Sequence, residues 1–323
     1  MIKHDELPAV ILVGGEGTRL RPLTEQTPKP MLPLLGEPLL THTLDHLRSG
    51  GVKRAILACG YLPTAIEAHF GSAYDGLALD YRVEPEPLGT GGAIRFAGED
   101  IDGTFLALNG DSLRDADLRR LVEFHRESKA KATILLTRVS DPTRYGLVRV
   151  DESGRVRGFV EKPRPEQIDT NAINAGMYVL EREVLDLIPA GLPVSIEREV
   201  FPALVEEGSL FALALPGYWL DVGTRESYLQ AHIDLLWRHG GIRIDPSAEV
   251  SDDVRLIPPL AIGARARIER QACLGPFVHI GDEAHLGRRA AVRWAAVLPK
   301  AQIAPGACIA RAIVSPETGA LSP

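Results

Sequence analysis

An aliphatic residue returns at every sixth position through the last quarter of this chain. Ten positions share the spacing, namely Ile244, Val250, Leu256, Ile262, Ile268, Leu274, Ile280, Leu286, Val292 and Leu298. Alanine often lies two residues earlier, and the phase slips by one after Leu298 before it resumes at Ile303. A period of six indicates the hexapeptide repeat of a left-handed parallel β-helix, with aliphatic side chains inside and alanines at tight corners. We assign to residues 241–323 a role in stacking and homo-oligomer formation.

The preceding residues, 1–240, alternate between strand-like and helix-like segments. The strand-like segments are Ala55 to Cys59, Thr104 to Leu108 and Ala132 to Val139. The helix-like segments are Thr41 to Arg48, Asp115 to Lys129 and Arg225 to Trp237. Such alternation predicts an α/β domain with a Rossmann-like, mostly parallel sheet covered by helices on both faces. Ligands of these sheets bind beyond the carboxyl ends of the strands.

The first apolar run leads directly into a glycine-rich, cationic segment. Residues 9–13 form a short, β-branched run typical of a buried parallel strand. Gly14, Gly15 and Gly17 follow, and glycines allow backbone N–H groups to approach an anion closely. Three cations lie in the next stretch, at Arg19, Arg21 and Lys29. Strand, glycine turn and cations together predict a polyphosphate site.

Two carboxylates follow apolar stretches in the same way. Asp111 comes after Asn109 and Gly110 at the end of a strand-like run, and Asp221 follows Trp219 and Leu220. Oxygen ligands at such places suit Mg²⁺. From the residues alone, Asp111 is equally well a turn residue and Asp221 a helix cap.

Composition and missing motifs exclude several classes of function. The net charge of −7 argues against a broad nucleic-acid or anionic membrane surface. No Gly-Lys-Ser/Thr loop is present, and Leu20 replaces the third glycine of a dinucleotide fingerprint. The three cysteines have no metal-ligand spacing, and no apolar run is long enough for a membrane helix or a signal core. We therefore expect a cytoplasmic protein.

The segment from Gly14 to Leu20, followed by Pro28-Lys29-Pro30, resembles the signature of the sugar-1-phosphate nucleotidyltransferases. Within that family the mannose-1-phosphate guanylyltransferases are the most similar, on the runs 195–202 and 217–223 and on the β-helix. The resemblance implies attack of a sugar 1-phosphate on the α-phosphorus of a nucleoside triphosphate, with Mg²⁺ as cofactor and pyrophosphate as leaving group.

The resemblance also implies roles for individual residues. The implied catalytic cations are Arg19 and Lys29, which clamp the triphosphate, and Lys162, which clamps the sugar phosphate. The implied nucleotide-binding residues are Leu12, Gly14, Gly15, Gly17, Thr18, Glu84, Gly89, Thr90, Asn109 and Gly110. The implied metal ligands are Asp111 and Asp221. The implied sugar-phosphate-binding residues are Gly146, Glu161, Lys162 and Asn174.

The sequence leaves the identities of the base and the sugar open. Guanine shows two donors on one edge, which a carboxylate of Glu84 or Glu86 can accept. GTP and mannose 1-phosphate are the expected substrates, with another base, glucose 1-phosphate or a heptose 1-phosphate as alternatives. A catalytically silent regulatory subunit, or a hexapeptide-repeat acyltransferase using His279 or His285, ranks lower. The role of Glu16 inside the glycine loop is open.

Overall fold

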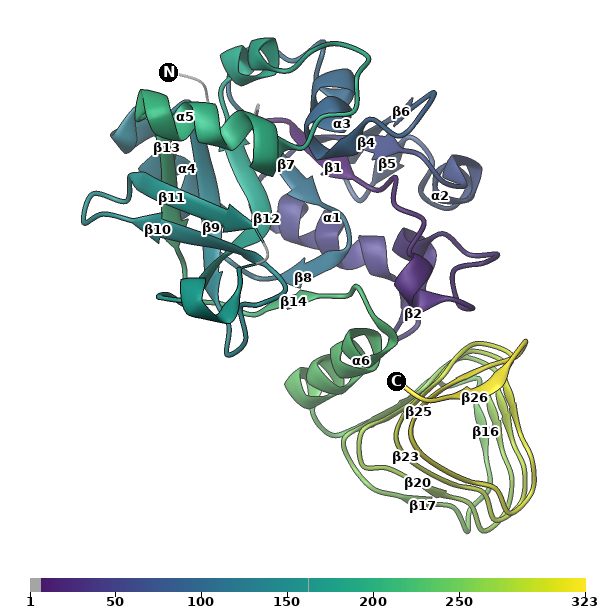
Figure 1. The fold of residues 1–323 in the computed structure, drawn as a ribbon. Helices are drawn as coiled ribbons and strands as arrows, with labels where there is room; N and C mark the ends of the chain where they lie inside the picture. The colour runs from purple at the N-terminus through teal and green to yellow at the C-terminus, as the bar shows by residue number, and fades with distance from the viewer. Residues whose placement is uncertain (1–6, 162) are drawn as a thin grey trace. The chain divides into compact units, whose positions relative to one another are not determined.

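A computed structural model of the chain describes residues 7–161 and 163–323, apart from the side chain of Glu161. The chain divides into two compact units. The first comprises the chain up to Glu16 together with His42–Trp219, and the second comprises Gly17–Thr41 and Leu220–Pro323. Figure 1 shows a helix-covered sheet in the first unit and the stacked coils of a β-helix in the second. The predicted α/β class with a C-terminal β-helix is confirmed.

The first unit is built on four parallel strands. They are β1 (Ala9–Leu12), β4 (Arg54–Cys59), β6 (Leu77–Val83) and β7 (Phe105–Asn109), in the order β7-β1-β4-β6. Leu12 lies opposite Asn109 on one side and Ala58 on the other. Because parallel strands end at one edge of the sheet, this register brings the segments after β1, β4, β6 and β7 together.

Antiparallel strands flank this parallel core. The strands are β5 (Ala73–Tyr74), β9 (Ala132–Arg138), β10 (Gly146–Val150), β11 (Val156–Glu161) and β12 (Ala172–Leu180). β12 runs antiparallel to β7, β9 and β10, whereas β13 (Leu210–Ala214) runs parallel to β9. The sheet is therefore parallel at its centre and mixed at its sides.

Helices cover the sheet of the first unit. They are α1 (Leu39–Ser49), α2 (Pro63–Phe70), α3 (Gly89–Ala97), α4 (Leu118–Ser128) and α5 (Phe201–Glu207), with a π-helical turn η6 (Ile196–Val200) before α5. Asp117 caps α4 by accepting the backbone N–H groups of Arg119 and Arg120, which is why the helix begins at Leu118. One apolar cluster joins the sheet, α3, η6 and α5, and it includes Ile94, Tyr178 and Phe201.

The β-helix follows the six-residue repeat. Its strands run from β15 (Ile242–Ile244) to β25 (Cys308–Ser315), and β26 (Gly319–Leu321) returns antiparallel on β25. Glu249 pairs with Arg267 and Arg267 with His285, whereas His285 pairs with Gln302, one residue earlier than the period requires. The phase slip after Leu298 thus shortens the last coil. The six-spaced side chains from Ile262 to Val292 are buried inside the coils.

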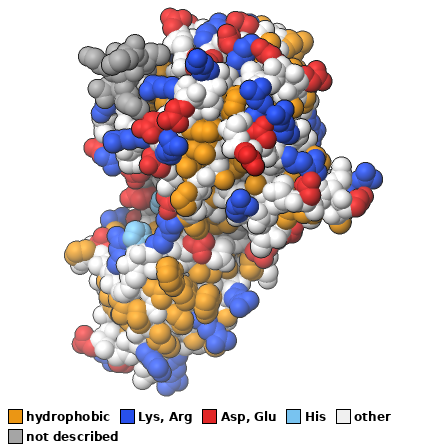
Figure 2. Space-filling model, turned by 90° about the vertical axis from the view of Figure 1, so that its left-hand side faces the viewer, with side chains coloured by type: hydrophobic (Ala, Val, Ile, Leu, Met, Phe, Trp, Pro, Cys, Tyr) orange, Lys and Arg blue, Asp and Glu red, His pale blue; other side chains and the backbone are white. Residues whose placement is uncertain are grey.

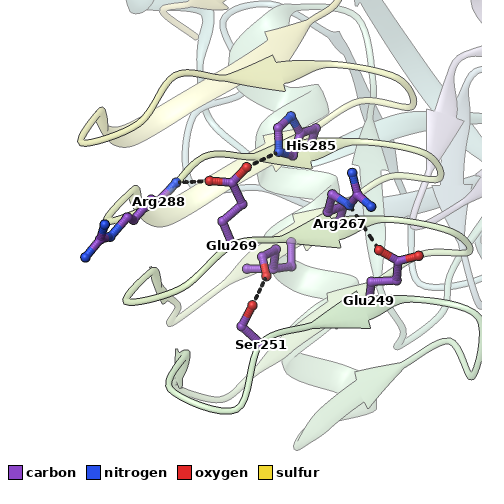
Figure 3. A network of polar contacts seen from close by, with 7 residues as sticks. Glu249, Ser251, Arg267, Glu269, His285 and Arg288 are labelled. Carbon is purple, nitrogen blue, oxygen red and sulfur yellow. Dashed lines mark hydrogen bonds and ion pairs between the residues drawn. The ribbon is translucent and has the colours of Figure 1, made fainter.

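Charged side chains form ladders on the outside of the coils, as Figure 3 shows. Nε of Arg267 lies 3.0 Å from Oε2 of Glu249, and Nε2 of His285 lies 2.9 Å from Oε1 of Glu269. The backbone N–H of Arg288 donates to Oε2 of the same Glu269 at 2.8 Å. Exposed pairs of this kind contribute little each, so the buried aliphatic column dominates the stability of the β-helix.

Helix α6 (Arg225–His239) packs on the β-helix strands β21 (Val278–Ile280), β23 (Ala291–Val297) and β25 within the second unit. Its Tyr228 hydroxyl donates to the carbonyl oxygen of Pro33, and its His232 ring stacks on His279 of β21 with centroids 5.2 Å apart. The segment Gly17–Thr41, which carries Arg19 and Lys29, thereby belongs to the same compact unit as the β-helix. None of the described helices is both long enough and apolar enough to cross a bilayer.

Candidate active site

A cavity of about 490 Å³ opens beyond the carboxyl ends of β1, β4 and β6. Its lining consists of Leu12, Gly14, Gly15, Glu16, Gly60, Tyr61, Glu84, Pro85, Glu86, Pro87, Gly89, Thr90 and Ala93. Six of the ten residues predicted to bind nucleotide lie here: Leu12, Gly14, Gly15, Glu84, Gly89 and Thr90. All of the lining residues belong to the first unit. The cavity has the size of a small-ligand site and the position that a doubly wound sheet gives to its ligand.

Gly14 is a position where a side chain would be crowded. A Cβ atom there would lie 3.1 Å from the backbone nitrogen of Gly60 and 3.2 Å from Oε1 of Glu84. The Gly14 carbonyl also accepts the N–H of Tyr61, and Glu84 donates its N–H to the carbonyl of Cys59. Glycine therefore lets the ends of three strands close around one wall of the cavity.

Glu84 presents a half-buried carboxylate on that wall. Its Oε2 accepts the backbone N–H of Leu88 at 2.9 Å. Burial raises the pKa of Glu84, and the hydrogen bond from Leu88 opposes the increase. Glu86, the alternative base reader, also lines the cavity but is exposed. Glu84 is therefore the more enclosed of the two carboxylates on the cavity wall.

Thr90 starts a hydrogen-bonded chain that leaves the cavity. Its Oγ1 donates to Oε2 of Glu197 at 2.8 Å, and the other oxygen of Glu197 accepts the hydroxyl of Tyr178 at 3.2 Å. The Tyr178 hydroxyl in turn accepts Nδ2 of Asn174 at 2.9 Å. Asn174 Oδ1 accepts the N–H of Gly176, which holds the bulge in β12. The chain thus links a nucleotide-cavity residue to a predicted sugar-site residue.

The turn after β7 lies beside the glycine turn. Gly110 donates its N–H to the carbonyl of Leu12, and a Cβ on Gly110 would lie 2.7 Å from Cγ1 of Val13. Asn109 and Gly110 are not among the cavity-lining residues, so their predicted nucleotide contacts stay predictions. Asp111 follows, half-buried, with its Oδ1 3.5 Å from the hydroxyl of Ser112.

The second unit contains the predicted triphosphate cations, Arg19 and Lys29, and the second predicted metal ligand, Asp221. Gly17 adopts a positive φ of 63° before the short turn that carries Thr18 and Arg19. A Cβ on Gly223 would lie 2.8 Å from Nη2 of Arg19 and 2.8 Å from Oδ2 of Asp221, so both side chains approach that glycine closely. Lys29 is buried at the start of another short turn.

The predicted sugar-phosphate residues come from three strands of the first unit. Gly146 of β10 pairs with Glu161 of β11, and Asn174 lies in β12. Nearby, Nε1 of Trp219 donates to the carbonyl of Ala175 at 2.9 Å. The ring of Tyr145 meets the Trp219 ring edge-on at 5.2 Å. Lys162 lies outside the described residues, so its role as the sugar-phosphate clamp stays a prediction.

The donor set fits a magnesium ion carried by its substrate. Among the described residues, no group of three or more His, Cys, Asp or Glu side chains could hold a metal. Mg²⁺ commonly uses only one or two carboxylates and completes its shell with phosphates and water. Asp111 and Asp221 are carboxylates of that kind: Asp111 lies two residues after the end of β7, and Asp221 is the last residue of β14 (Trp219–Asp221).

Sequence reasoning missed Gly60 and Tyr61, which line the cavity, and Glu197, which anchors the hydrogen-bonded chain. A signal existed for the first two because they directly follow the strand-like run Ala55 to Cys59. For Glu197 the only signal was its place in the run 195–202, and its contact with Thr90 was not predictable because the two residues lie 107 positions apart in the sequence.

Comparisons with known proteins agree with this geometry. The sequence model of the family described as Nucleotidyl transferase matches residues 8–237. A mannose-1-phosphate guanylyltransferase of Mycobacterium tuberculosis is 44% identical over 277 residues, which are 81% of this chain and 77% of that protein. A probable mannose-1-phosphate guanylyltransferase of Oryza sativa is 35% identical over 95% of this chain and 86% of its own length.

Two solved structures are also similar to this chain. HddC from Yersinia pseudotuberculosis, complexed with GMP-PN, matches with a TM-score of 0.61 and 32% identity over 70% of this chain and 97% of that chain. A putative glucose-1-phosphate thymidylyltransferase from Bacillus anthracis matches with a TM-score of 0.64 and 25% identity over 70% of this chain and 93% of its own. The chain therefore belongs to the nucleotidyl transferase family and is an enzyme that forms a nucleotide sugar from a nucleoside triphosphate and a sugar 1-phosphate.

Proposed function

We propose that this enzyme transfers a guanylyl group from GTP to mannose 1-phosphate, with Mg²⁺ as its metal, in the cytoplasm. The mannose-1-phosphate guanylyltransferases from Mycobacterium tuberculosis and Oryza sativa support both substrates by their similarity. The Yersinia pseudotuberculosis protein, solved with GMP-PN, supports a guanine nucleotide.

The half-buried carboxylate of Glu84 on the cavity wall is the observation that carries the choice of base. A carboxylate has about four lone-pair sites, so Oε2 can keep its bond from Leu88 and still accept another donor. Guanine offers N1–H and its amino group side by side, which matches two carboxylate oxygens. These donors also favour the charged form of Glu84, which burial disfavours. Adenine and cytosine lack this pair of donors.

Different residues are proposed to bind the nucleotide and the sugar 1-phosphate. Gly14 and Gly15 bring backbone to the nucleotide, and Arg19 and Lys29 follow that turn in sequence as the proposed triphosphate cations. Asn174, Gly146, Glu161 and Lys162 are the proposed sugar-phosphate residues. The sugar 1-phosphate oxygen attacks the α-phosphorus and pyrophosphate leaves, so catalysis consists mainly of positioning and charge neutralisation.

Asp111 and Asp221 are the proposed ligands of Mg²⁺. When bound, the ion supplies positive charge to the phosphates and orients them for displacement. Among the described residues neither carboxylate belongs to a group of three or more His, Cys, Asp or Glu side chains that could hold a metal, which suits an ion that arrives with the triphosphate.

Homo-oligomer formation through the β-helix is part of the proposal. The strands of the first coil, β15, β16 (Glu249–Val250) and β17 (Arg255–Leu256), are edge strands of the described residues, and unpaired edges favour pairing with another chain. Ile242 and Ile244 of that coil are exposed, as is Trp237 at the end of α6. Figure 2 shows hydrophobic side chains gathered on the β-helix.

The acyltransferase alternative finds no support in the repeat region. His279 is buried and stacks on His232, and His285 is bonded to Glu269 on the outside of the coils. Neither histidine lines the described cavity.

A pyrophosphate-release assay tests the reaction. We expect release to require GTP, mannose 1-phosphate and Mg²⁺ together, and Asp111→Asn to reduce the rate by roughly 10²–10³. Asp102→Asn, which changes an exposed carboxylate in the segment before β7, serves as the control. Equal release with no sugar phosphate present would contradict the proposal.

A further inference from the structure

Arg114 is a buried cation to which the proposed reaction gives no role. It ends β8 (Ser112–Arg114) and is 7% exposed. Its Nη2 donates to the carbonyl oxygen of Asn109 at 3.0 Å. Its Nε and Nη1 are buried and have no hydrogen-bond partner among the described residues. Buried donors without partners cost free energy, so packing alone does not account for an arginine here.

The guanidinium acts mainly on one carboxylate. Burial lowers the pKa of Arg114 to about 10, and the charge of Asp111 is the largest effect in the opposite direction. Arg114 therefore stays charged at neutral pH. Asp111 lies three residues earlier, in the turn between β7 and β8, and the hydrogen bond to Asn109 fixes the guanidinium against the start of that turn. His46, which also feels this charge, has its pKa lowered by burial and adds no negative charge.

The described cavity beside the guanidinium is too small to hold a bound anion. The cavity next to the guanidinium is lined by Thr137, Ala175 and Trp219 among others and has a volume of only about 10 Å³. That space holds at most about one water molecule. The charge of Arg114 is therefore offset through Asp111, and any ion that Asp111 binds must meet the field of Arg114.

We propose that Arg114 is a positioning residue that makes Asp111 select the metal–triphosphate complex over the free metal ion. The inference rests on the proposed function, because it requires Asp111 to be a metal ligand. A free divalent cation at Asp111 adds positive charge beside a fixed guanidinium, with nothing to compensate it. The metal–triphosphate complex carries net negative charge, so the same guanidinium attracts it. Arg114 thus weakens binding of the free metal ion and favours binding of the metal–triphosphate complex.

Mn²⁺ binding, followed by electron paramagnetic resonance of the free ion, tests the inference without turnover. The titration compares the full-length enzyme with Arg114→Met, which removes the charge, and Arg114→Lys, which keeps it. Each is titrated alone and with a GTP analogue that has a methylene group between the α- and β-phosphorus. We expect Arg114→Met to bind free Mn²⁺ about tenfold more tightly and Arg114→Lys to resemble the unchanged enzyme. The ratio of the affinity for the Mn²⁺–analogue complex to the affinity for free Mn²⁺ should fall in Arg114→Met and stay unchanged in Arg114→Lys.

An unchanged or weaker affinity of Arg114→Met for free Mn²⁺ would overturn the inference. A purely structural role predicts that result, because a loosened turn binds every ligand less well. Arg114→Gln replaces the Met variant if the latter does not fold.

Asp111→Asn distinguishes failure of the metal site from failure of the role of Arg114. If it leaves Mn²⁺–analogue binding unchanged, the metal assignment in the proposed function is wrong. If it weakens that binding while Arg114→Met leaves free Mn²⁺ affinity unchanged, only the role of Arg114 is wrong.

Discussion

Glu84 is the residue on which the choice of base depends. Replacing it with Gln keeps its shape but adds a donor that faces the donors of guanine. We expect the kcat/KM ratio of GTP to ATP to fall by the equivalent of about 1–3 kcal/mol, the cost of an unpaired buried polar group. Steady-state kinetics with both triphosphates measure this ratio. Glu86→Gln, an exposed residue of the same loop, should leave it unchanged. Equal ratios in all three proteins would transfer base reading to the backbone near Gly14.

Tyr178 tests the hydrogen-bonded chain between the two halves of the site. Tyr178→Phe removes the hydroxyl that joins Glu197 to Asn174 and leaves the buried ring in place. We expect the KM for sugar 1-phosphate to rise several-fold, because the Asn174 amide loses its anchor, while the dissociation constant of the nucleotide analogue stays the same. Tyr81→Phe, which removes a hydroxyl bonded to the carbonyl of Gly71, is the control. Parallel losses for both substrates would argue for a general packing role of Tyr178.

At the scale of single residues, the sequence identifies site residues that directly follow strands. It does not identify residues that come together only through the packing of distant segments. Gly14, Glu84 and Thr90 were predictable, and the cavity contains them. Arg114 resembles a surface cation in the sequence, and only the packing around β8 buries it. No local pattern records such burial, because it depends on residues such as Thr137 and Trp219 that are distant in the chain.

At the scale of elements, the junction of α6 and β21 predicts a pH-dependent stability. Burial lowers the pKa of His279 from 6.5 to about 4. Between these values the unfolded chain takes up a proton that the folded chain does not. The free energy of unfolding should therefore decrease as the pH falls from 6.5 towards 4, by on the order of 3 kcal/mol, and be unaffected by His279 above 6.5.

Urea unfolding at several pH values measures this effect. His279→Phe keeps an aromatic ring against His232 but cannot titrate, so its free energy of unfolding should depend less on pH in that window. His285→Phe, which changes a histidine on the outside of the coils, is the control. An unchanged pH dependence in His279→Phe would show that the buried imidazole is not responsible.

The elements themselves were predictable to within a few residues. The predicted strand Ala55 to Cys59 corresponds to β4, and the predicted helix Arg225 to Trp237 corresponds to α6. The antiparallel strands beside β7 were not predicted, because a hydrophobic pattern contains no information on strand direction. The six-residue repeat was the more complete guide, since its period predicts the pairing of the strands and the burial of the six-spaced side chains from Ile262 to Val292, although Ile244 in the first coil is exposed.

At the scale of the whole molecule, the exposed first coil predicts assembly. Ile244 is 41% exposed on an edge strand, so Ile244→Glu places a charge where another chain would pair. We expect this variant to lose oligomeric mass in light scattering while it keeps its binding of the GTP analogue. Leu187→Glu alters an exposed apolar residue of the first unit and should not change the mass. If Ile244→Glu kept the full mass, the first coil would not be the interface.

A competition experiment tests the central claim of guanylyl transfer most directly. The full-length enzyme receives equal amounts of GTP, ATP, UTP, CTP and dTTP with mannose 1-phosphate and Mg²⁺, and mass spectrometry identifies the nucleotide sugars that form. The account predicts that GDP-mannose is the main product and that pyrophosphate appears in equal amount. A main product with another base, or pyrophosphate with no nucleotide sugar, would contradict it.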